Sequence, residues 1–129
     1  MTNTLILEFL GVANEWLKRN QEETKFRYAV AKIARKAERV KATIQETVDD
    51  INVENALEDT STKKLLKNDR DQYEFSKEGM NKRNEAVRKL MQETNEITPH
   101  FSEPPDGLPS EFRIVFEGFV IKPEESNGG

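Results

Sequence analysis

The clearest pattern in the sequence is a long run of apolar residues separated by three or four positions. No Gly or Pro interrupts this run, which comprises Phe26, Val30, Ile33, Ala37, Val40, Ile44, Val48 and Ile51. Such spacing places the residues on one face of an α-helix and resembles the seam of a coiled coil. It predicts a helix from about Lys25 to about Leu57, roughly 50 Å long at 1.5 Å per residue. Tyr28, Ala29 and Ala34 are expected to widen its buried face.

Two shorter segments have the same helical spacing. One runs from Thr4 to Lys18, and the other runs from Lys77 to Thr94 with Ser76 as its predicted N-cap. Ahead of the long helix, Asn20 and Thr24 are both candidate N-caps, and the sequence does not decide between them.

The residues between the long helix and Ser76 are polar and lack helical spacing. Residues 59–62 are a polar break, 63–67 are expected to form a helical turn, 68–71 a turn, and 73–75 a short strand.

Residues 109–121 fit two structures. Pro109 can occupy the first turn of a helix whose apolar residues share one face, but Phe112, Ile114 and Phe116 also alternate as in a strand. We favour a helix to about Glu117 and then a short strand, 119–121, that could pair with 97–101. Residues 122–129 are expected to be a disordered tail.

These elements predict a mainly α fold. It is an antiparallel helical hairpin or bundle around one long helix, with a small C-terminal extended or β element and a single domain over residues 1–121. Apolar residues make up 35% of the chain and charged residues 34%, so the core must be thin.

Composition argues against an enzyme. The chain has no Cys and one His, which removes thiolate metal sites and Cys nucleophiles, and no phosphate loop or catalytic triad is visible. We therefore expect no catalytic residue, no cofactor and no metal. His100 lies near Glu96 and Glu103 on an extended segment, and a surface histidine is the favoured interpretation. No apolar run is long enough to span a membrane, and the apolar residues 5–10 are too few for a signal peptide, so we expect a cytoplasmic protein.

Charge is unevenly distributed along the long helix. The first half of this helix is basic, and the stretch that follows this half is acidic. This distribution of charge opposes the helix dipole. The third helix, through Lys82, Arg83, Arg88 and Lys89, or an antiparallel second copy could compensate. The basic half could also bind phosphate groups through Lys25, Lys32, Lys36 and Arg39, although a solvated face is favoured.

Aromatic residues offer a second possible binding surface. Trp16, Phe112, Phe116 and Phe119 could anchor a partner, because aromatic side chains are enriched at interaction hot spots. The same residues lie on apolar helix faces, so a place in the core is favoured.

The order of these elements resembles a family of small uncharacterised proteins encoded among the structural genes of tailed bacteriophages and prophages. Three patches carry the resemblance: an aromatic-x-x-Ala-Lys signature within residues 26–32, an aromatic alternation at 73–75, and a Pro-led apolar segment at 109–121. The turn at 68–71 departs from the family, where it often contains Gly. The resemblance implies a role in particle or tail assembly, with a phage structural protein as partner, in the host cytoplasm or in the virion.

The sequence thus predicts a non-enzymatic structural or assembly protein that acts through protein–protein contacts, with itself as a homodimer or with a phage protein. No membrane contact is expected. The alternative is a nucleic-acid-binding accessory protein that uses the basic face of the long helix.

Overall fold

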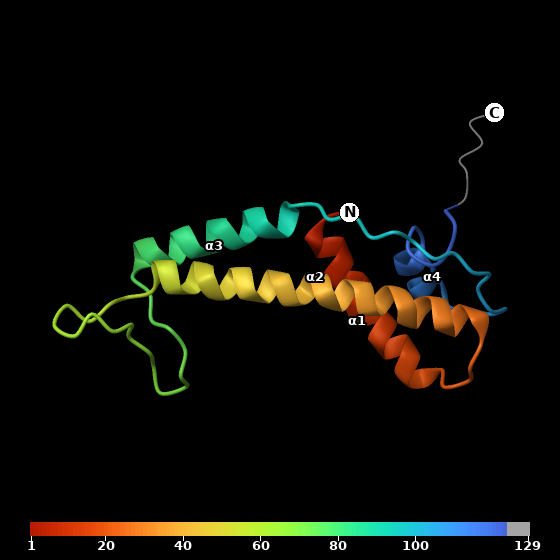
Figure 1. The fold of residues 1–129 in the computed structure, drawn as a ribbon, viewed down its shortest axis with the longest axis horizontal. Coiled ribbons are helices and arrows are strands. Elements are labelled where there is room, and N and C mark those ends of the chain that lie inside the picture. Colours follow the sequence, from red (N-terminus) through yellow and green to blue (C-terminus); the bar gives the residue numbers. More distant parts are fainter. Residues whose placement is uncertain (124–129) are drawn as a thin grey trace, which may run out of the picture. The chain divides into compact units, whose positions relative to one another are not determined.

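The computed structural model describes residues 1–123 and is mainly α-helical, as predicted. Four helices lie in this part of the chain: α1 (Asn3–Arg19), α2 (Lys25–Asn55), α3 (Lys77–Gln92) and α4 (Ser110–Phe116) (Figure 1). The long helix α2 and the bounds of α1 and α3 agree with the sequence to within a few residues. Most of the tail expected at 122–129 lies outside the described residues.

The chain divides into two compact units. Unit 1 contains residues 1–41 together with the described residues from Thr94 onward, and unit 2 contains residues 42–93. Helix α2 contributes its first half to unit 1 and its second half to unit 2. The single domain expected for residues 1–121 stays a prediction.

Side-chain caps set where three helices begin. The Thr2 hydroxyl accepts from Leu5 N, the Thr24 hydroxyl from Arg27 N at 3.0 Å, and the Ser76 hydroxyl from Gly79 N at 3.0 Å. Thr24 therefore caps α2, and Ser76 caps α3 as predicted. Asn20 instead ends α1, because its side-chain amide donates to the Trp16 carbonyl at 2.8 Å.

Aromatic side chains fill the centre of the unit 1 core. The Phe116 ring on α4 is fully buried, with its centroid 5.7 Å from Phe9, 6.1 Å from Trp16 and 6.0 Å from Phe26. The Phe9 ring also stacks on Phe119 at 4.3 Å. The aliphatic part of the core comes from α1, α2 and the C-terminal segment, and includes Ile6, Val30, Ile33, Ile97, Val120 and Ile121.

Residues after α3 join unit 1 through backbone hydrogen bonds. His100 N donates to the Phe119 carbonyl at 3.0 Å, and Ser102 N donates to the Val120 carbonyl at 2.9 Å. The C-terminal segment therefore pairs with residues 100–102, where the sequence suggested 97–101. The helix predicted from Pro109 is present as α4. The strand predicted at 119–121 is absent, because Val120 N and Ile121 N both bond back to the Phe116 carbonyl.

Unit 2 is an antiparallel helical hairpin formed by residues 42–55 of α2 and by α3 (Figure 1). The two backbones approach closely at Gly79, where an added Cβ would lie 2.5 Å from the Asn55 carbonyl oxygen. One helical turn further along α3, Arg83 Nε donates to Asn52 Oδ1 at 2.8 Å. These two contacts fix the register of the hairpin.

The segment between α2 and α3 consists of extended stretches joined by turns. The helical turn predicted for 63–67 is wrong: Leu65 forms an antiparallel bridge with Glu58, and Lys67 forms one with Tyr73. Asn68 forms the predicted turn, because its side-chain oxygen accepts from Arg70 N and Gln72 N.

Burial along the seam of α2 differs between the units. In unit 1, Val30, Ile33 and Ala37 are fully buried, whereas in unit 2 Val48 and Ile51 are only partly buried. Ala29 and Ala34 are buried as predicted. Tyr28 is 60% exposed, so its predicted place on the buried face is wrong.

Candidate functional site

The four aromatic residues considered as partner anchors are core residues. Trp16, Phe112, Phe116 and Phe119 have exposed fractions of 7% or less. They contact one another or Phe9 and Phe26 rather than solvent. An exposed docking patch made of these four side chains is therefore not present in this structure, and the favoured core interpretation describes them.

Two of the four basic residues considered for phosphate binding contact the extended segment that follows α3. Lys32 Nζ lies 3.2 Å from His100 Nδ1, and Lys36 Nζ donates to the Thr98 carbonyl at 3.1 Å. Both ammonium groups thus hold the extended segment against α2. Arg39 is exposed, and Lys25 lines a groove at the start of α2.

That groove lies in unit 1 and has a volume of about 630 Å³. We call it the basic–aromatic groove. Its walls come from the first turns of α2, the residues just before them, and the extended segment: Glu23, Thr24, Lys25, Arg27, Tyr28, Ala31, Arg35, His100, Phe101 and Ser102. Sequence reasoning missed Arg27, Tyr28, Arg35 and Phe101 as members of a common site.

Helical spacing explains one wall of the groove. Thr24, Tyr28, Ala31 and Arg35 are three or four positions apart, so they follow one another along one face of α2. Ala31 presents only a methyl group between the longer side chains of Tyr28 and Arg35. This small residue leaves room for the groove.

The opposite wall comes from the extended segment. The His100 ring meets the Tyr28 ring edge-on, with centroids 5.9 Å apart. Because lysine only donates, His100 Nδ1 is the acceptor for Lys32, which places the proton of a neutral ring on Nε2. Phe101 is 45% exposed, so the groove carries two accessible aromatic rings, those of Tyr28 and Phe101.

A second candidate surface is the hairpin of unit 2, which buries little apolar area. Ile44 and Leu90 are its buried hydrophobic residues within the described chain. Met80 is 39% exposed and Val53 44%, and five further apolar side chains are partly buried: Val48, Ile51, Ala86, Val87 and Met91. Two helices alone do not cover this seam.

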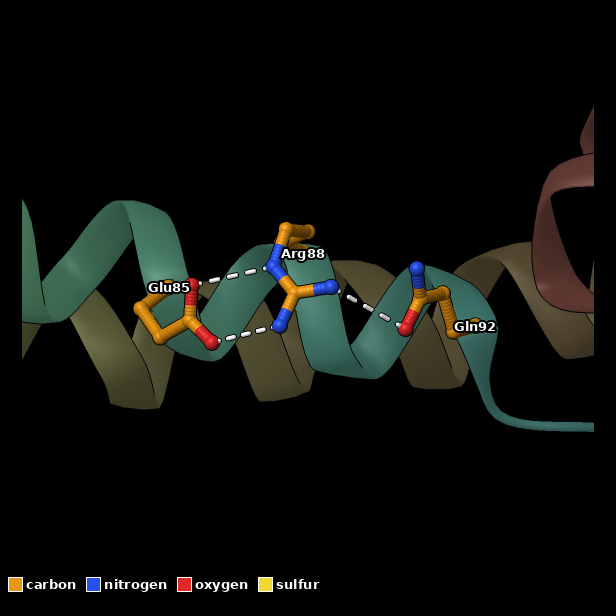
Figure 2. A network of polar contacts seen from close by, with 3 residues as sticks. All are labelled: Glu85, Arg88 and Gln92. Carbon is orange, nitrogen blue, oxygen red and sulfur yellow. Dashed lines mark hydrogen bonds and ion pairs between the residues drawn. The ribbon is translucent and has the colours of Figure 1, made fainter.

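The bases of the hairpin lie on α3, whereas residues 42–55 of α2 carry acids alone. Exposed acidic residues lie on α2. The sequence suggested the bases of α3 as their partners, but two of these bases form ion pairs within α3 instead. Lys82 pairs with Glu78 at 3.2 Å, and Figure 2 shows Arg88 held between Glu85 and Gln92, all on α3. Within residues 1–123, no ion pair joins the α2 acids Glu46, Asp49, Asp50 and Glu54 to a base of α3.

Two carboxylates of unit 2 have lowered pKa values. The hydrogen bond from the Ser61 hydroxyl, at 2.6 Å, is the main cause of the low pKa of Asp59. The side-chain hydrogen bond from Arg88 is the main cause of the low pKa of Glu85. The lowered pKa keeps both carboxylates ionised, and each serves turn or helix structure, so neither has the environment of a general acid.

Residues 1–123 contain no group of three or more His, Cys, Asp or Glu that could hold a metal ion. No helix in this part of the chain is long and apolar enough to cross a membrane.

No protein-family model matches the chain, and no curated protein or solved structure matches it either. Function is therefore inferred from the basic–aromatic groove and from the hairpin of unit 2.

Proposed function

We propose that this chain is a non-enzymatic interaction protein that pairs with a second copy of itself through the hairpin of unit 2. The observation that supports this most is the incompletely covered apolar seam of the hairpin. Apolar surface of this kind on a soluble protein commonly marks a contact site. A second hairpin would convert two helices into a four-helix arrangement with a shared core.

Charge complementarity favours a second copy as the occupant. A two-fold axis parallel to the helices would lay α2 of each copy beside α3 of the other. Arg83 contacts Asn52, so its neighbour Lys82 lies at the level of residues 50–54 of α2. Lys82 of one copy would then lie near Asp50 and Glu54 of the other. The acidic residues of α2 gain basic neighbours in this arrangement, which the single hairpin does not provide.

The resemblance to phage proteins supports a role for such a dimer in particle or tail assembly. The dimer would be the form that meets a phage structural protein, in the host cytoplasm or in the virion. Genes for capsid or tail proteins beside this one would support the assembly role. A neighbourhood of unrelated metabolic genes would count against it, without affecting the dimer.

A charge-swap pair tests the dimer. Lys89 lies two turns further along α3 than Lys82, at the level of Glu46 of α2. One variant carries Lys82→Glu and Lys89→Glu, and the other carries Glu46→Lys, Asp50→Lys and Glu54→Lys. Each variant alone places like charges opposite one another and should dissociate at a concentration where the unchanged protein is dimeric. An equimolar mixture restores opposite charges at both contacts, so it should form a heterodimer. Light scattering after size-exclusion chromatography measures the mass in each case.

Two results would reject this arrangement. A strictly monomeric unchanged protein at high micromolar concentration would remove the dimer altogether. If the Lys82→Glu, Lys89→Glu variant stays as dimeric as the unchanged protein, α3 is not at the interface, and pairing of α2 with α2 becomes the better description.

A further inference from the structure

We propose that the basic–aromatic groove binds single-stranded nucleic acid. An unpaired base would stack against the rings of Tyr28 and Phe101, and the adjoining phosphate would lie against Lys25, Arg27 and Arg35. This site belongs to unit 1 and does not depend on the dimer proposed for unit 2.

Two exposed aromatic rings in the groove indicate a stacking site for bases. Tyr28 is 60% exposed and Phe101 is 45% exposed, although unit 1 buries its other Phe and Trp side chains almost completely. Both rings line the same groove. Stacking of unpaired bases on accessible aromatic rings is the common way in which proteins hold single strands without reading their sequence.

Three cationic side chains in the groove indicate a site for a phosphate group. Lys25, Arg27 and Arg35 line the groove together with both rings, so positive charge and stacking surface coincide. Arg27 Nε donates to the Asn20 carbonyl at 2.7 Å, which holds the guanidinium group in place. Glu23 also lines the groove and opposes a phosphate, so removing its charge should strengthen binding.

The size of the groove and the charge of the whole chain define the ligand further. A volume of about 630 Å³ lies within the range of about 300–1,000 Å³ typical of small-ligand sites, enough for one nucleotide unit rather than a duplex. The chain has a net charge of −4, so no general attraction for phosphate backbones exists. Binding should therefore be local, and it should need unpaired bases.

Fluorescence anisotropy of a labelled thymidine oligonucleotide of about 12 residues tests the site, because single-strand sites commonly cover about 4–16 nucleotides. Tyr28→Ala and Phe101→Ala should each weaken binding by about tenfold, as expected for loss of one stacked base. Ala31→Leu should also abolish or strongly weaken binding, because the longer side chain enters the groove. Lys64→Ala and Ile114→Ala remove an exposed cation and an exposed apolar residue outside the groove, and they should bind normally.

Salt dependence separates the role of the cations from that of the rings. Between about 50 and 200 mM salt, Arg35→Ala should reduce the slope of log K against log salt by about 0.7, the value for one phosphate contact on a single strand. Tyr28→Ala should leave this slope unchanged. Glu23→Gln should bind more tightly than the unchanged protein.

The proposal fails if Ala31→Leu and Tyr28→Ala, with unchanged circular dichroism, bind the oligonucleotide like the unchanged protein. Equal affinity for the duplex would also overturn it, because paired bases cannot reach the rings. If free thymidine monophosphate competes at the same concentration as the oligonucleotide, the groove takes a free nucleotide and the single-strand assignment is wrong.

Discussion

Replacing Phe116 with Ala is the most direct test of how unit 1 is held together. The Phe116 ring is fully buried and lies within about 6 Å, between centroids, of Phe9, Trp16 and Phe26. Phe→Ala substitutions in cores typically cost about 3–5 kcal/mol through lost burial and the cavity left behind. Aromatic pairs add about 0.5–1.5 kcal/mol each beyond burial, so the upper part of that range is expected. Domains are commonly stable by only about 5–15 kcal/mol, so unit 1 should come close to unfolding.

Urea unfolding followed with two signals measures this effect. Trp16 is the only Trp in the chain, and it is buried beside Phe116, so its fluorescence reports on the core of unit 1. Circular dichroism at the same urea concentrations reports on all helices, including α3. The Phe116→Ala substitution should move the fluorescence midpoint strongly towards lower urea.

Phe101→Ala is the matched control, because it removes the same side chain from a position that is 45% exposed. Substitutions away from the core usually change stability by about 0.5 kcal/mol or less. If Phe116→Ala and Phe101→Ala shift the midpoint equally, or if neither shifts it, the packing of α4 against α1 and α2 is refuted.

Further predictions concern two glycines, in α3 and α1, and one carboxylate of α3. Gly79→Ala should destabilise the hairpin, although Ala is the better helix former, because its Cβ would lie 2.5 Å from the Asn55 carbonyl oxygen. Gly11→Ala should instead stabilise α1 by about 0.5–1 kcal/mol, since nothing lies within 4 Å of that Cβ; thermal melts of the two variants moving in the same direction would contradict this. The pKa of Glu85 is lowered by its hydrogen bond to Arg88, so the contact stabilises the folded state above the ordinary pKa of 4.5 and is lost as the pH falls through the lower, folded value. A carboxyl NMR titration should therefore give a midpoint below 4.5 for Glu85, and Arg88→Ala should return it to about that value; an unchanged midpoint in that variant would assign the shift to another cause.

Local signals in the sequence were enough to predict the helices. The three-and-four spacing defined α2, and Ser76 marked the start of α3, because both depend on residues that are close along the chain. The bridges at Leu65 and Lys67 were missed for the opposite reason. Their partners are set by backbone pairing across turns, where Lys63 and Asp71 adopt positive φ, and no periodicity records that.

The candidate site was less predictable than the fold. Tyr28 was assigned to the buried face together with Ala29 and Ala34, yet it lines the groove with Thr24 and Arg35. Phe101 is far from α2 along the chain and reaches it because residues 100 and 102 pair with 119 and 120. Helical spacing could have grouped Tyr28 with Arg35, but only the tertiary fold brings in Phe101.

Unit 1 is built from two separate segments of the chain, and this affects how the protein folds during synthesis. Its core joins the residues up to Lys41 with those from Thr94 onward, and all of unit 2 is translated between them. At about 5–20 residues per second, the ribosome needs roughly 3–10 s to pass from the first part to the second. During that interval unit 2 can form its hairpin. Ile6, Phe9 and Val30 stay unburied until their core partners Phe116 and Val120 are synthesised. The nascent chain thus exposes these core side chains for seconds, and a product that ends before Phe116 lacks part of the unit 1 core.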